Sequence, residues 1–215
     1  MVNFLLLLEE ITIYSKNDID QGKTPPNVYM ICSCIREAFC LSYAIRKDNF
    51  LFLYFQREHI LTKFDGRTIR YLGPDERSQA ILLNKAVTKI YETFDIVNNR
   101  WIESTPGISS KKFANDLEFI EFFKSISYGK NYFIMDLPQD KHENIKLLNL
   151  DKNFIPIDHS DFFIIPTSNI QKNHKTIIEM LKKIKNINIL SLPMIKSIED
   201  KILYINFRKD QQSIS

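Results

Sequence analysis

Glycine is scarce in this 215-residue chain, which has five, all of them at or before Gly129. The carboxy-terminal third therefore lacks the residue that most easily lets the backbone approach a bound cofactor. The chain also contains no G-x-G-x-x-G run, no Walker A lysine loop, no G-x-S-x-G and no H-E-x-x-H. These absences exclude the common signatures of nucleotide-binding proteins, serine hydrolases and zinc proteases.

Only three cysteines are present, Cys32, Cys34 and Cys40, and they fall within nine residues on one expected helix. A disulfide among them would have poor geometry, so we expect reduced thiols. The C-x-C pair has no histidine or second cysteine pair at zinc-finger spacing nearby, so we expect no bound metal. The expected role of these cysteines is that of small apolar side chains in the core.

Long apolar runs are missing as well. The apolar stretch 4–8 is followed at once by Glu9 and Glu10, unlike a signal peptide, and no segment approaches the roughly 18 consecutive apolar residues of a membrane span. We therefore expect a soluble, cytoplasmic protein with no membrane partner. Because 44% of the residues are hydrophobic, the chain can bury one core, which predicts a single domain over 1–215.

Charge of one sign is not in large excess. The net charge of +3 is mild compared with proteins whose basicity alone indicates nucleic-acid binding, so it permits an RNA partner without requiring one. The expected helix at 170–185 is an exception, because it is locally basic. That basic stretch is either an electrostatic footprint for RNA or a solvated surface. Its basic residues are Lys172, His174, Lys175, Lys182, Lys183 and Lys185.

The first half of the chain predicts a mixture of strands and helices. Thr24 and the two prolines after it predict a capped helix that continues to about Ile45. Asp65-Gly66 predicts a hairpin turn within an antiparallel meander. The Pro-Gly pair in 104–107 predicts a loop between two longer helices. The expected strands are 4–14, 50–56, 59–64 and 68–72, and the longer helices are 75–98 and 111–127.

From residue 131 onward, short apolar strands alternate with amphipathic helices. This alternation indicates an α/β fold with a parallel sheet covered by helices. Ligands of such sheets bind outside the carboxyl ends of the strands, which here fall around Asp136, Asp158 and Ser191. The expected strands are 132–135, 154–157 and 187–192, and the expected helices are 170–185 and 195–206.

Three polar motifs have both a functional and an ordinary interpretation. Asp158-His159 follows an expected strand and is suited to proton transfer, although a loop histidine is the plainer alternative. Asp75-Glu76-Arg77 opens a helix, where acidic residues also complement the positive helix end. Arg46-Lys47 follows a helix and is suited to phosphate contacts, although an exposed basic pair is the default for such residues.

Three stretches carry a resemblance to a known family: Ala44-Ile45-Arg46-Lys47-Asp48 at the end of the first helix, Gly73-Pro74-Asp75-Glu76-Arg77 at the start of the next, and Ser104-Thr105-Pro106-Gly107-Ile108 after that. With these motifs and the matching order of elements, the chain resembles the archaeal TrmY-type tRNA (pseudouridine-54 N1)-methyltransferases of the SPOUT superfamily. The resemblance covers nearly the full chain and is strongest from about residue 27 to 112.

The resemblance implies a SPOUT-type α/β fold, with a mostly parallel sheet flanked by helices and a carboxy-terminal trefoil knot at about 130–207. Such a knot is an exception to the rule that chains do not thread loops. It also implies a homodimer that binds S-adenosyl-L-methionine in the knot loops and methylates N1 of pseudouridine 54 in tRNA. That reaction requires loss of the N1 proton, stabilisation of charge on the uracil oxygens and alignment of the reacting atoms.

The resemblance further implies which residues act. The implied catalytic residues are Asp75, Arg77 and Arg46, and the implied RNA-binding residues are Arg36, Arg46 and Lys47. Three loops would hold the cofactor largely through backbone amides and carbonyls. The implied cofactor-binding residues are Met135, Asp136 and Leu137 in the first loop, Ile157, Asp158 and His159 in the second, and Leu190, Ser191, Leu192 and Met194 in the third.

The chain departs from the family pattern in three places. Residues 27–30 stand where the family has Gly-Arg-Leu-Asp, so an arginine and an aspartate that look functional in the family are missing, and 197–201 replaces a histidine-rich segment. Residues 157–161 keep the Asp-His of the second loop but neither glycine, so the side chains of Ile157 and Asp161 could obstruct the cofactor. A second hypothesis is therefore a non-catalytic relative that binds RNA or a protein partner without cofactor, and a third is a structural or partner-binding protein that binds no RNA.

Overall fold

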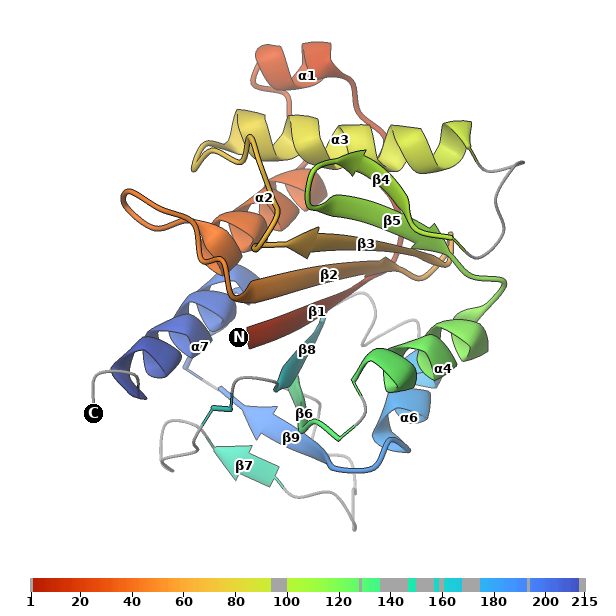
Figure 1. Cartoon of the computed structure of the whole chain (residues 1–215), viewed down its shortest axis with the longest axis vertical. Coiled ribbons are helices and arrows are strands. Elements are labelled where there is room, and N and C mark those ends of the chain that lie inside the picture. The colour runs from red at the N-terminus through yellow and green to blue at the C-terminus, as the bar shows by residue number, and fades with distance from the viewer. Residues whose placement is uncertain are drawn as a thin grey trace.

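A mixed sheet runs through the part of the chain that the computed structural model describes, which is residues 2–93, 100–127, 129–135, 147–149, 157–158, 161–167, 175–192 and 194–212. In these ranges the sheet has nine strands, in the order β4-β5-β3-β2-β1-β8-β6-β9-β7 (Figure 1). The strands are β1 Val2–Leu8, β2 Asn49–Phe55, β3 Ile60–Asp65, β4 Ile102–Thr105, β5 Ile108–Lys112, β6 Tyr132–Met135, β7 Leu147–Asn149, β8 Phe162–Pro166 and β9 Ile187–Ser191. The helices are α1 Lys16–Asp20, α2 Pro26–Phe39, α3 Glu76–Glu92, α4 Asp116–Ile126, α6 Lys175–Lys182 and α7 Ile198–Gln212.

The sheet is parallel in one half and antiparallel in the other. β1 pairs in parallel with β2 and β8, and β6 pairs in parallel with β8 and β9. β3, β5 and β4 continue from β2 in antiparallel pairs. Because Tyr132 lies opposite both Phe162 and Ile187, the parallel strands begin on a common side, which we call the amino side. The opposite side, the carboxyl side, is where strands end at Leu8, Met135, Pro166 and Ser191.

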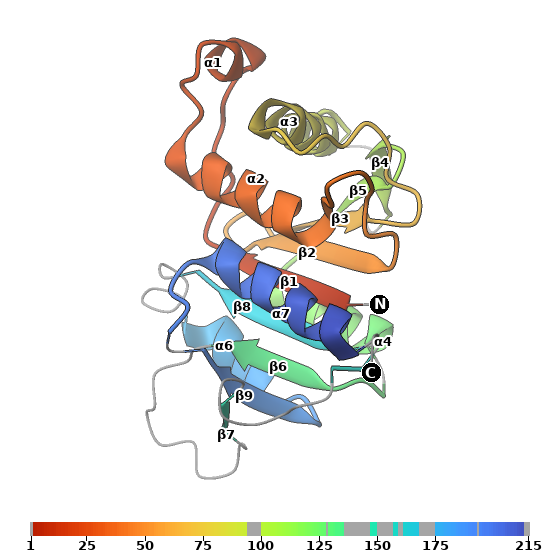
Figure 2. The ribbon, with the colours of Figure 1, turned by 90° about the vertical axis from the view of Figure 1, so that its left-hand side faces the viewer.

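Helices cover both faces of the sheet, because β1 is apolar on both. Phe4 and Leu6 contact the core beneath α2, α3 and α7, whereas Leu5 and Leu7 contact the core beneath α4 and α6. This alternation follows from the two-residue repeat of a strand. Figure 1 shows α2 and α7 to the left of the sheet and α4 and α6 to its right, and Figure 2 shows α2 and α7 side by side. A strand buried on both faces is typical of a parallel sheet, and the expected α/β fold is confirmed.

Two buried asparagines join α7 to α2 and β2. Asn49 Nδ2 donates to Asn206 Oδ1 at 2.9 Å and to the Ala38 carbonyl at 2.8 Å. Asn206 Nδ2 donates in turn to the Glu37 carbonyl at 2.8 Å. These bonds hold the last turn of α2 and the middle of α7 beside the start of β2, and the amino-terminal ends of both helices lie toward the carboxyl side.

The expected antiparallel meander is wrong in its third strand. Residues 68–72 form no strand, because β3 pairs instead with β5, with Ile60 opposite Lys112. The turn between β2 and β3 includes His59, whose φ is 54°. The Pro106-Gly107 pair forms the turn of a hairpin between β4 and β5, so the helix expected from 111 begins only at Asp116.

The first helix is shorter than expected. α2 ends at Phe39, and Cys40 then pairs with Ile45 in an isolated bridge. The predicted cap is also wrong, since the N-cap residue is Pro25, which makes no side-chain hydrogen bond, and Thr24 Oγ1 is buried with no partner among the described residues. A helix end of this kind leaves its first N–H groups without a side-chain acceptor.

The first strand ends at Leu8 rather than at residue 14, and a short helix that the sequence analysis did not predict follows it. Ser15 caps this helix, α1, because its Oγ accepts from the Asp18 N–H while the Asp18 carboxylate accepts from the Ser15 N–H at 2.8 Å. Such a reciprocal capping box lets a helix of one turn form.

The cysteines occupy the expected environment. Cys32 and Cys34 are buried and unbridged, and burial raises the pKa of Cys32 to about 12. Cys40 is half-buried and lies just beyond α2 rather than within it. Among the described residues, no three His, Cys, Asp or Glu side chains are grouped as a metal site requires.

In the second half, β6 and β9 confirm two expected strands, and α6 and α7 confirm two helices. The expected strand 154–157 lies mostly outside the described residues, and Ile157 itself is not in a strand. β8, at Phe162–Pro166, was not predicted and lies between β1 and β6 in the sheet. No helix in the described part of the chain has the length and apolar character needed to cross a bilayer.

Gly107 tests the packing of the β4-β5 hairpin. Its φ is 82°, and a Cβ there would lie 2.3 Å from Ile69 N. We expect Gly107→Ala to lower the free energy of unfolding by about 3 kcal/mol. The alanine would have to adopt a left-handed backbone conformation, and its Cβ would overlap the backbone of Ile69. Gly22→Ala is the matched control, because Gly22 has a φ of 68° and no atom lies within 4 Å of a Cβ placed there. This substitution should lower the free energy of unfolding by only about 1 kcal/mol. Equal losses in urea unfolding would contradict the steric explanation.

Candidate functional site

A cleft of about 270 Å³ opens at the carboxyl side, where β1 and β8 end and α2 and α7 begin. Ligands of parallel sheets bind at this side, outside the strand ends. The cleft is partly apolar, with Met30, Ile31 and Ile198 among its lining residues. Its polar lining residues are Glu9, Glu10, Asn27 and Thr167.

Backbone pairing explains why the cleft opens there. β1 is held on both sides up to its last residue, because Gln56 N donates to the Leu8 carbonyl at 2.9 Å and Thr167 N donates to the Leu7 carbonyl at 3.1 Å. Beyond Leu8 the chain follows β2 alone, with Arg57 N donating to the Glu9 carbonyl at 2.9 Å. The chain thereby separates from the end of β8.

Two long helices begin at this cleft. α2 has 14 residues and α7 has 15, and Asn27 and Ile198 of their first turns line the cleft. The N-terminus of a helix carries partial positive charge and unpaired N–H groups. Two such ends facing one cleft suit a carboxylate or a phosphate.

Acidic side chains give the rim of the cleft the opposite charge. The Arg57 guanidinium lies 3.7 Å from Glu9 Oε1 and also pairs with Glu10. The rim of the cleft thus carries the carboxylates of Glu9 and Glu10 beside the positive helix ends. Groups of both signs at one cleft suit a ligand that carries charges of both signs.

Several predicted cofactor-binding residues lie at the carboxyl side. Met135 ends β6, and Leu190, Ser191 and Leu192 lie at the end of β9. The side chains of Met135, Leu190 and Leu192 are buried in the core, so only their backbone groups are placed to meet a ligand. Met194 is 84% exposed. The remaining predicted residues Asp136, Leu137 and His159 lie outside the described residues.

The predicted position of Ile157 and Asp158 at the carboxyl side is wrong. β8 begins at Phe162 on the amino side, so the residues just before it lie on that side as well. Ile157 N donates to Gln212 Oε1, at the end of α7, at 3.0 Å. The carboxyl end of β8 leads instead into Thr167, which lines the cleft.

Asp161 also lies at the amino side, where it closes the turn before β8. Its Oδ1 accepts from Asn131 Nδ2 at 3.1 Å and its Oδ2 accepts from Asp158 N at 2.7 Å. Burial raises the pKa of the Asp161 carboxyl in spite of these bonds. The expectation that Ile157 and Asp161 obstruct a cofactor is therefore wrong for a ligand in the carboxyl-side cleft.

The residues predicted to act in catalysis and RNA binding gather at the far end of α2. Arg36 is in the last turn of α2, and Arg46 N donates to the Phe39 carbonyl at the end of that helix, at 2.8 Å. Asp75 lies near the same end, because Cys40 Sγ is 3.7 Å from the carbonyl of Gly73. A helix of 14 residues is about 21 Å long. Within one chain, about that distance separates these residues from the carboxyl-side cleft.

Ion pairs occupy most of these charged side chains. Arg46 donates from both terminal nitrogens to the Asp210 carboxylate, at 2.7 and 2.6 Å, and its side chain is 16% exposed. This bidentate pair ties the loop after α2 to α7. Of the other predicted cations, Arg77 pairs with Asp20 at 2.8 Å, Arg36 pairs with Glu37 at 2.8 Å, and Lys47 is exposed.

Asp75 is the N-cap of α3, where its Oδ1 accepts from Ser78 N at 2.8 Å. That bond holds the pKa of the Asp75 carboxyl below its ordinary value. We expect Asp75→Ala to destabilise the protein by about 1 kcal/mol near neutral pH, whereas Asp75→Asn retains the cap. A lowered carboxyl pKa stabilises above the unfolded pKa, so the loss should shrink below about pH 4. Denaturant unfolding at both pH values measures this.

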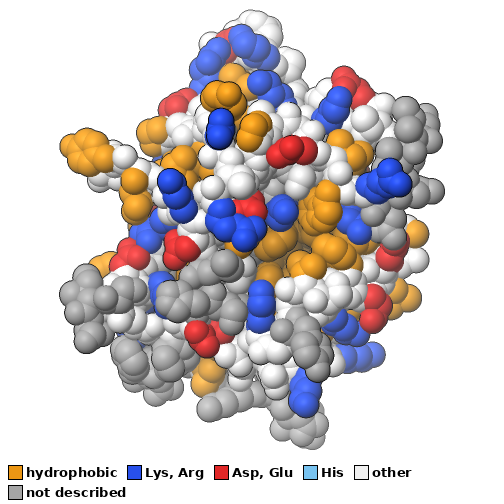
Figure 3. Space-filling model, in the orientation of Figure 1, with side chains coloured by type: hydrophobic (Ala, Val, Ile, Leu, Met, Phe, Trp, Pro, Cys, Tyr) orange, Lys and Arg blue, Asp and Glu red, His pale blue; other side chains and the backbone are white. Residues whose placement is uncertain are grey.

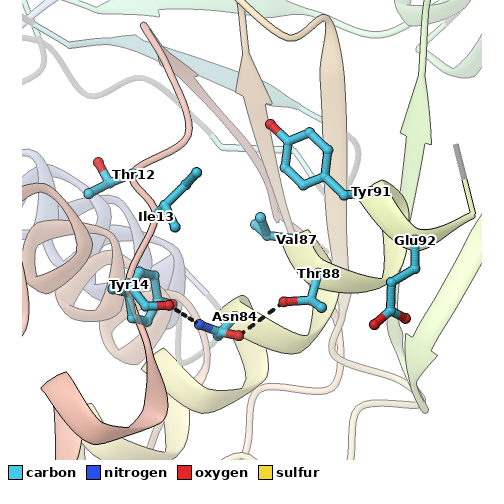
Figure 4. A pocket seen from close by; sticks show the side chains of 8 residues that line it. All are labelled: Thr12, Ile13, Tyr14, Asn84, Val87, Thr88, Tyr91 and Glu92. Carbon is cyan, nitrogen blue, oxygen red and sulfur yellow. Dashed lines mark hydrogen bonds between the residues drawn. The ribbon is translucent and has the colours of Figure 1, made fainter.

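A second cavity, of about 200 Å³, lies between residues 12–14 and α3 (Figure 4). Its polar groups bond one another: Asn84 Nδ2 donates to the Tyr14 carbonyl at 2.6 Å, and Thr88 Oγ1 donates to Asn84 Oδ1 at 3.2 Å. Tyr14 OH donates to the Ala80 carbonyl at 2.7 Å. These bonds hold the segment against α3, and none of the predicted site residues lines this cavity.

Sequence analysis did not identify Glu9, Glu10, Asn27 or Thr167 as cleft residues. A charged pair directly after the apolar run 4–8 marks the end of a strand, which is a usable signal in a parallel sheet. Thr167 offered no such signal, because β8 itself was not expected.

Residues 16–184 match the model of a family described as putative SAM-dependent RNA methyltransferases. A tRNA (pseudouridine(54)-N(1))-methyltransferase of Methanocaldococcus jannaschii is 31% identical over 123 residues, 56% of this chain and 58% of that protein. One of Methanococcus maripaludis is 34% identical over 136 residues, 60% of this chain and 63% of that protein. The chain thus matches less than two thirds of the length of these relatives.

A crystal structure of Archaeoglobus fulgidus Nep1 bound to S-adenosylhomocysteine is similar in fold. The TM-score is 0.52, with 12% sequence identity, and the superposition covers 100% of this chain and 99% of that chain. At this identity the similarity concerns the fold alone.

Proposed function

We propose that this chain, which belongs to the family of putative SAM-dependent RNA methyltransferases, binds S-adenosyl-L-methionine in the carboxyl-side cleft and methylates N1 of pseudouridine 54 in tRNA. The observation that carries the proposal is the cleft itself, placed at the ends of parallel strands in a chain of this family. The names of the relatives support the choice of substrate.

The residues of the cleft fit this cofactor. The helix ends at Asn27 and Ile198 suit its carboxylate, and the carboxylates of Glu9 and Glu10 suit its ammonium and sulfonium charges. The backbone groups of Met135 and Leu190–Leu192, with Thr167 in place of Ile157, are the proposed contacts of the strand ends. When bound, the cofactor supplies a methyl group that forms a bond to N1 as the bond to sulfur breaks.

The protein's part in the reaction is to position the base, accept its N1 proton and balance charge on the uracil oxygens. Arg46, Arg77 and Asp75 remain the proposed catalytic residues, with Arg36 and Lys47 as RNA contacts. Arg46 and Arg36 are suited to oxygens and phosphates because a guanidinium presents paired donors. They lie at the far end of α2, so a single chain does not bring them to its own cleft.

We infer that a homodimer solves this separation, with the arginines of one subunit next to the cleft of the other. Exposed apolar side chains on α2 and α7 support an interface there: Tyr29 is 53% exposed, Leu203 is 46% exposed and Phe207 is 52% exposed. The two helices lie side by side without a covering element among the described residues (Figure 2). A two-fold axis across them would place opposite helix ends together.

The trefoil knot is part of the same proposal. The chain passes from β6 to β7 at the edge of the sheet, then to β8 on the other side of β6, and returns to β9 between β6 and β7. This crossing order supports a threaded carboxy-terminal segment.

Calorimetric titration with S-adenosyl-L-methionine tests the proposed function first. We expect micromolar binding or tighter, about −8 kcal/mol, and methyl transfer to tRNA with pseudouridine at position 54 but not to the same tRNA with uridine there. No binding at millimolar cofactor by a folded, dimeric protein would overturn the enzyme and leave a non-catalytic RNA-binding relative. Asn27→Trp should abolish binding by filling the cleft, whereas Thr88→Trp, in the second cavity, should not.

A further inference from the structure

A third cavity, of about 320 Å³, lies at the amino side, away from the proposed cofactor cleft. Four of its eight described lining residues are lysines, Lys124, Lys130, Lys183 and Lys185, and none of the eight is acidic. Sequence analysis left the basic stretch that includes Lys183 and Lys185 without a definite role. The structure adds Lys124 and Lys130 to it, from a different part of the chain.

Sheet register brings these lysines together. Lys130 precedes β6 and Lys185 precedes β9, and the two strands begin side by side because Tyr132 pairs with Ile187. Tyr132 N donates to the Asn186 carbonyl at 3.2 Å, which joins the two approaches to the sheet. Lys124 is contributed by the last turn of α4. The cavity is therefore a built feature of the amino side rather than a property of one helix.

The lysines around the cavity carry more positive charge than is needed to balance the negative ends of the nearby helices. α4 and α6 both end near this cavity, and each carboxyl end carries about half a negative charge. Lys124 is paired with Glu121 at 2.7 Å. The ammonium of Lys130 lies 5.1 Å from the centre of the Phe162 ring, a contact that orients it without neutralising it. Among the described lining residues, Lys130, Lys183 and Lys185 leave a net positive charge.

Among the described residues, a row of phenylalanines continues from the cavity along the amino side. Phe162, Phe52 and Phe50 follow one another at ring separations of 5.9 and 6.2 Å. The Arg67 guanidinium lies 4.6 Å from the centre of the Phe50 ring and pairs with the Asp65 carboxylate at 2.7 Å, so it adds no net positive charge to that of the lysine cavity. Figure 3 shows basic side chains at the lower right of this face, where Figure 1 places α4 and α6.

We propose that the lysine cavity binds backbone phosphates of the RNA substrate, an inference that rests on the proposed function. Ammonium groups contact phosphates without reading sequence, and Lys130, Lys183 and Lys185 around one cavity are placed to contact neighbouring phosphates of one strand. Because the cavity and the cofactor cleft lie on opposite sides of the sheet, the contact holds RNA and does not touch the reacting base. Its loss should raise KM for tRNA and leave kcat unchanged.

The test compares the triple variant Lys130→Gln, Lys183→Gln, Lys185→Gln with a control of equal charge, Lys23→Gln, Lys85→Gln, Lys89→Gln. Fluorescence anisotropy of labelled tRNA is followed over a series of salt concentrations. Loss of three phosphate contacts should weaken binding about tenfold or more at low salt and reduce the slope of log K against log salt by about 2 to 3. The control should keep the wild-type slope, and calorimetry should give all three proteins the same cofactor affinity.

The outcomes separate the two proposals. Wild-type protein that binds cofactor but no tRNA would overturn the proposed substrate and the cavity's role with it. Wild-type protein that binds tRNA, with a triple variant of unchanged salt slope, would overturn the cavity's role alone. Lys183→Glu, a single reversal at an exposed position, provides a second variant with minimal risk to folding and should weaken tRNA binding on its own.

Discussion

Mixing two inactive variants is expected to restore about a quarter of wild-type methyl transfer, because random assortment makes half of the dimers mixed and each mixed dimer has one intact site of two. The variants are Asn27→Trp, which fills the cleft, and Arg46→Ala, which removes the proposed catalytic arginine. Neither homodimer should methylate tRNA measurably. Activity is measured after the purified chains are unfolded and refolded together, with each variant refolded alone as the reference.

The Arg46 variant needs a control for the ion pair that it breaks. Asp210→Ala breaks the same bidentate pair but keeps the arginine. If Arg46 acts only as a partner for Asp210, the two variants should lose activity and stability equally. If it acts in the partner's cleft, only Arg46→Ala should be inactive. If mass spectrometry shows mixed dimers but the mixture recovers no methyl transfer, the proposal of a site shared between subunits is wrong.

Asp116→Ala is expected to cause a large loss of stability. Asp116 Oδ1 accepts from Tyr54 OH at 2.6 Å and Oδ2 accepts from Gln56 Nε2 at 2.7 Å, and His59 Nδ1 lies 3.3 Å from Oδ1. Burial, together with this carboxylate, raises the pKa of Tyr54 and keeps its hydroxyl protonated. Removing the acceptor leaves Gln56 Nε2 unpaired and leaves Tyr54 OH with only His59 Nδ1, at 3.3 Å, and should cost about 3 kcal/mol.

Thermal unfolding measures this loss, which corresponds to a decrease in Tm of roughly 6–12 °C for a chain of this size. Asp116→Asn is the matched control. Gln56 Oε1 is buried without a partner among the described residues, so after an amide flip it can accept from the new asparagine, and less than half of the stability should be lost. An asparagine variant as unstable as the alanine variant would show that the negative charge, rather than the pairing, stabilises this cluster.

The amino-acid sequence was sufficient for the α/β class, for the strands β2, β6 and β9, and for the family. Local features carry these results: an apolar run of four to seven residues predicts a buried strand wherever it pairs, and motifs such as 44–48 and 73–77 need no knowledge of contacts. The same local reasoning placed Cys32 and Cys34 in the core correctly.

Tertiary structure alone decided which end of each strand faces the site. Asp158 and Thr167 flank one strand, β8, yet only Thr167 reaches the cleft, because pairing with β1 and β6 sets the direction and register of β8. Likewise Lys130 and Lys185 meet only through the pairing of β6 with β9. Pairing joins residues far apart in the chain, and its free energy depends on contacts that no short stretch of sequence contains.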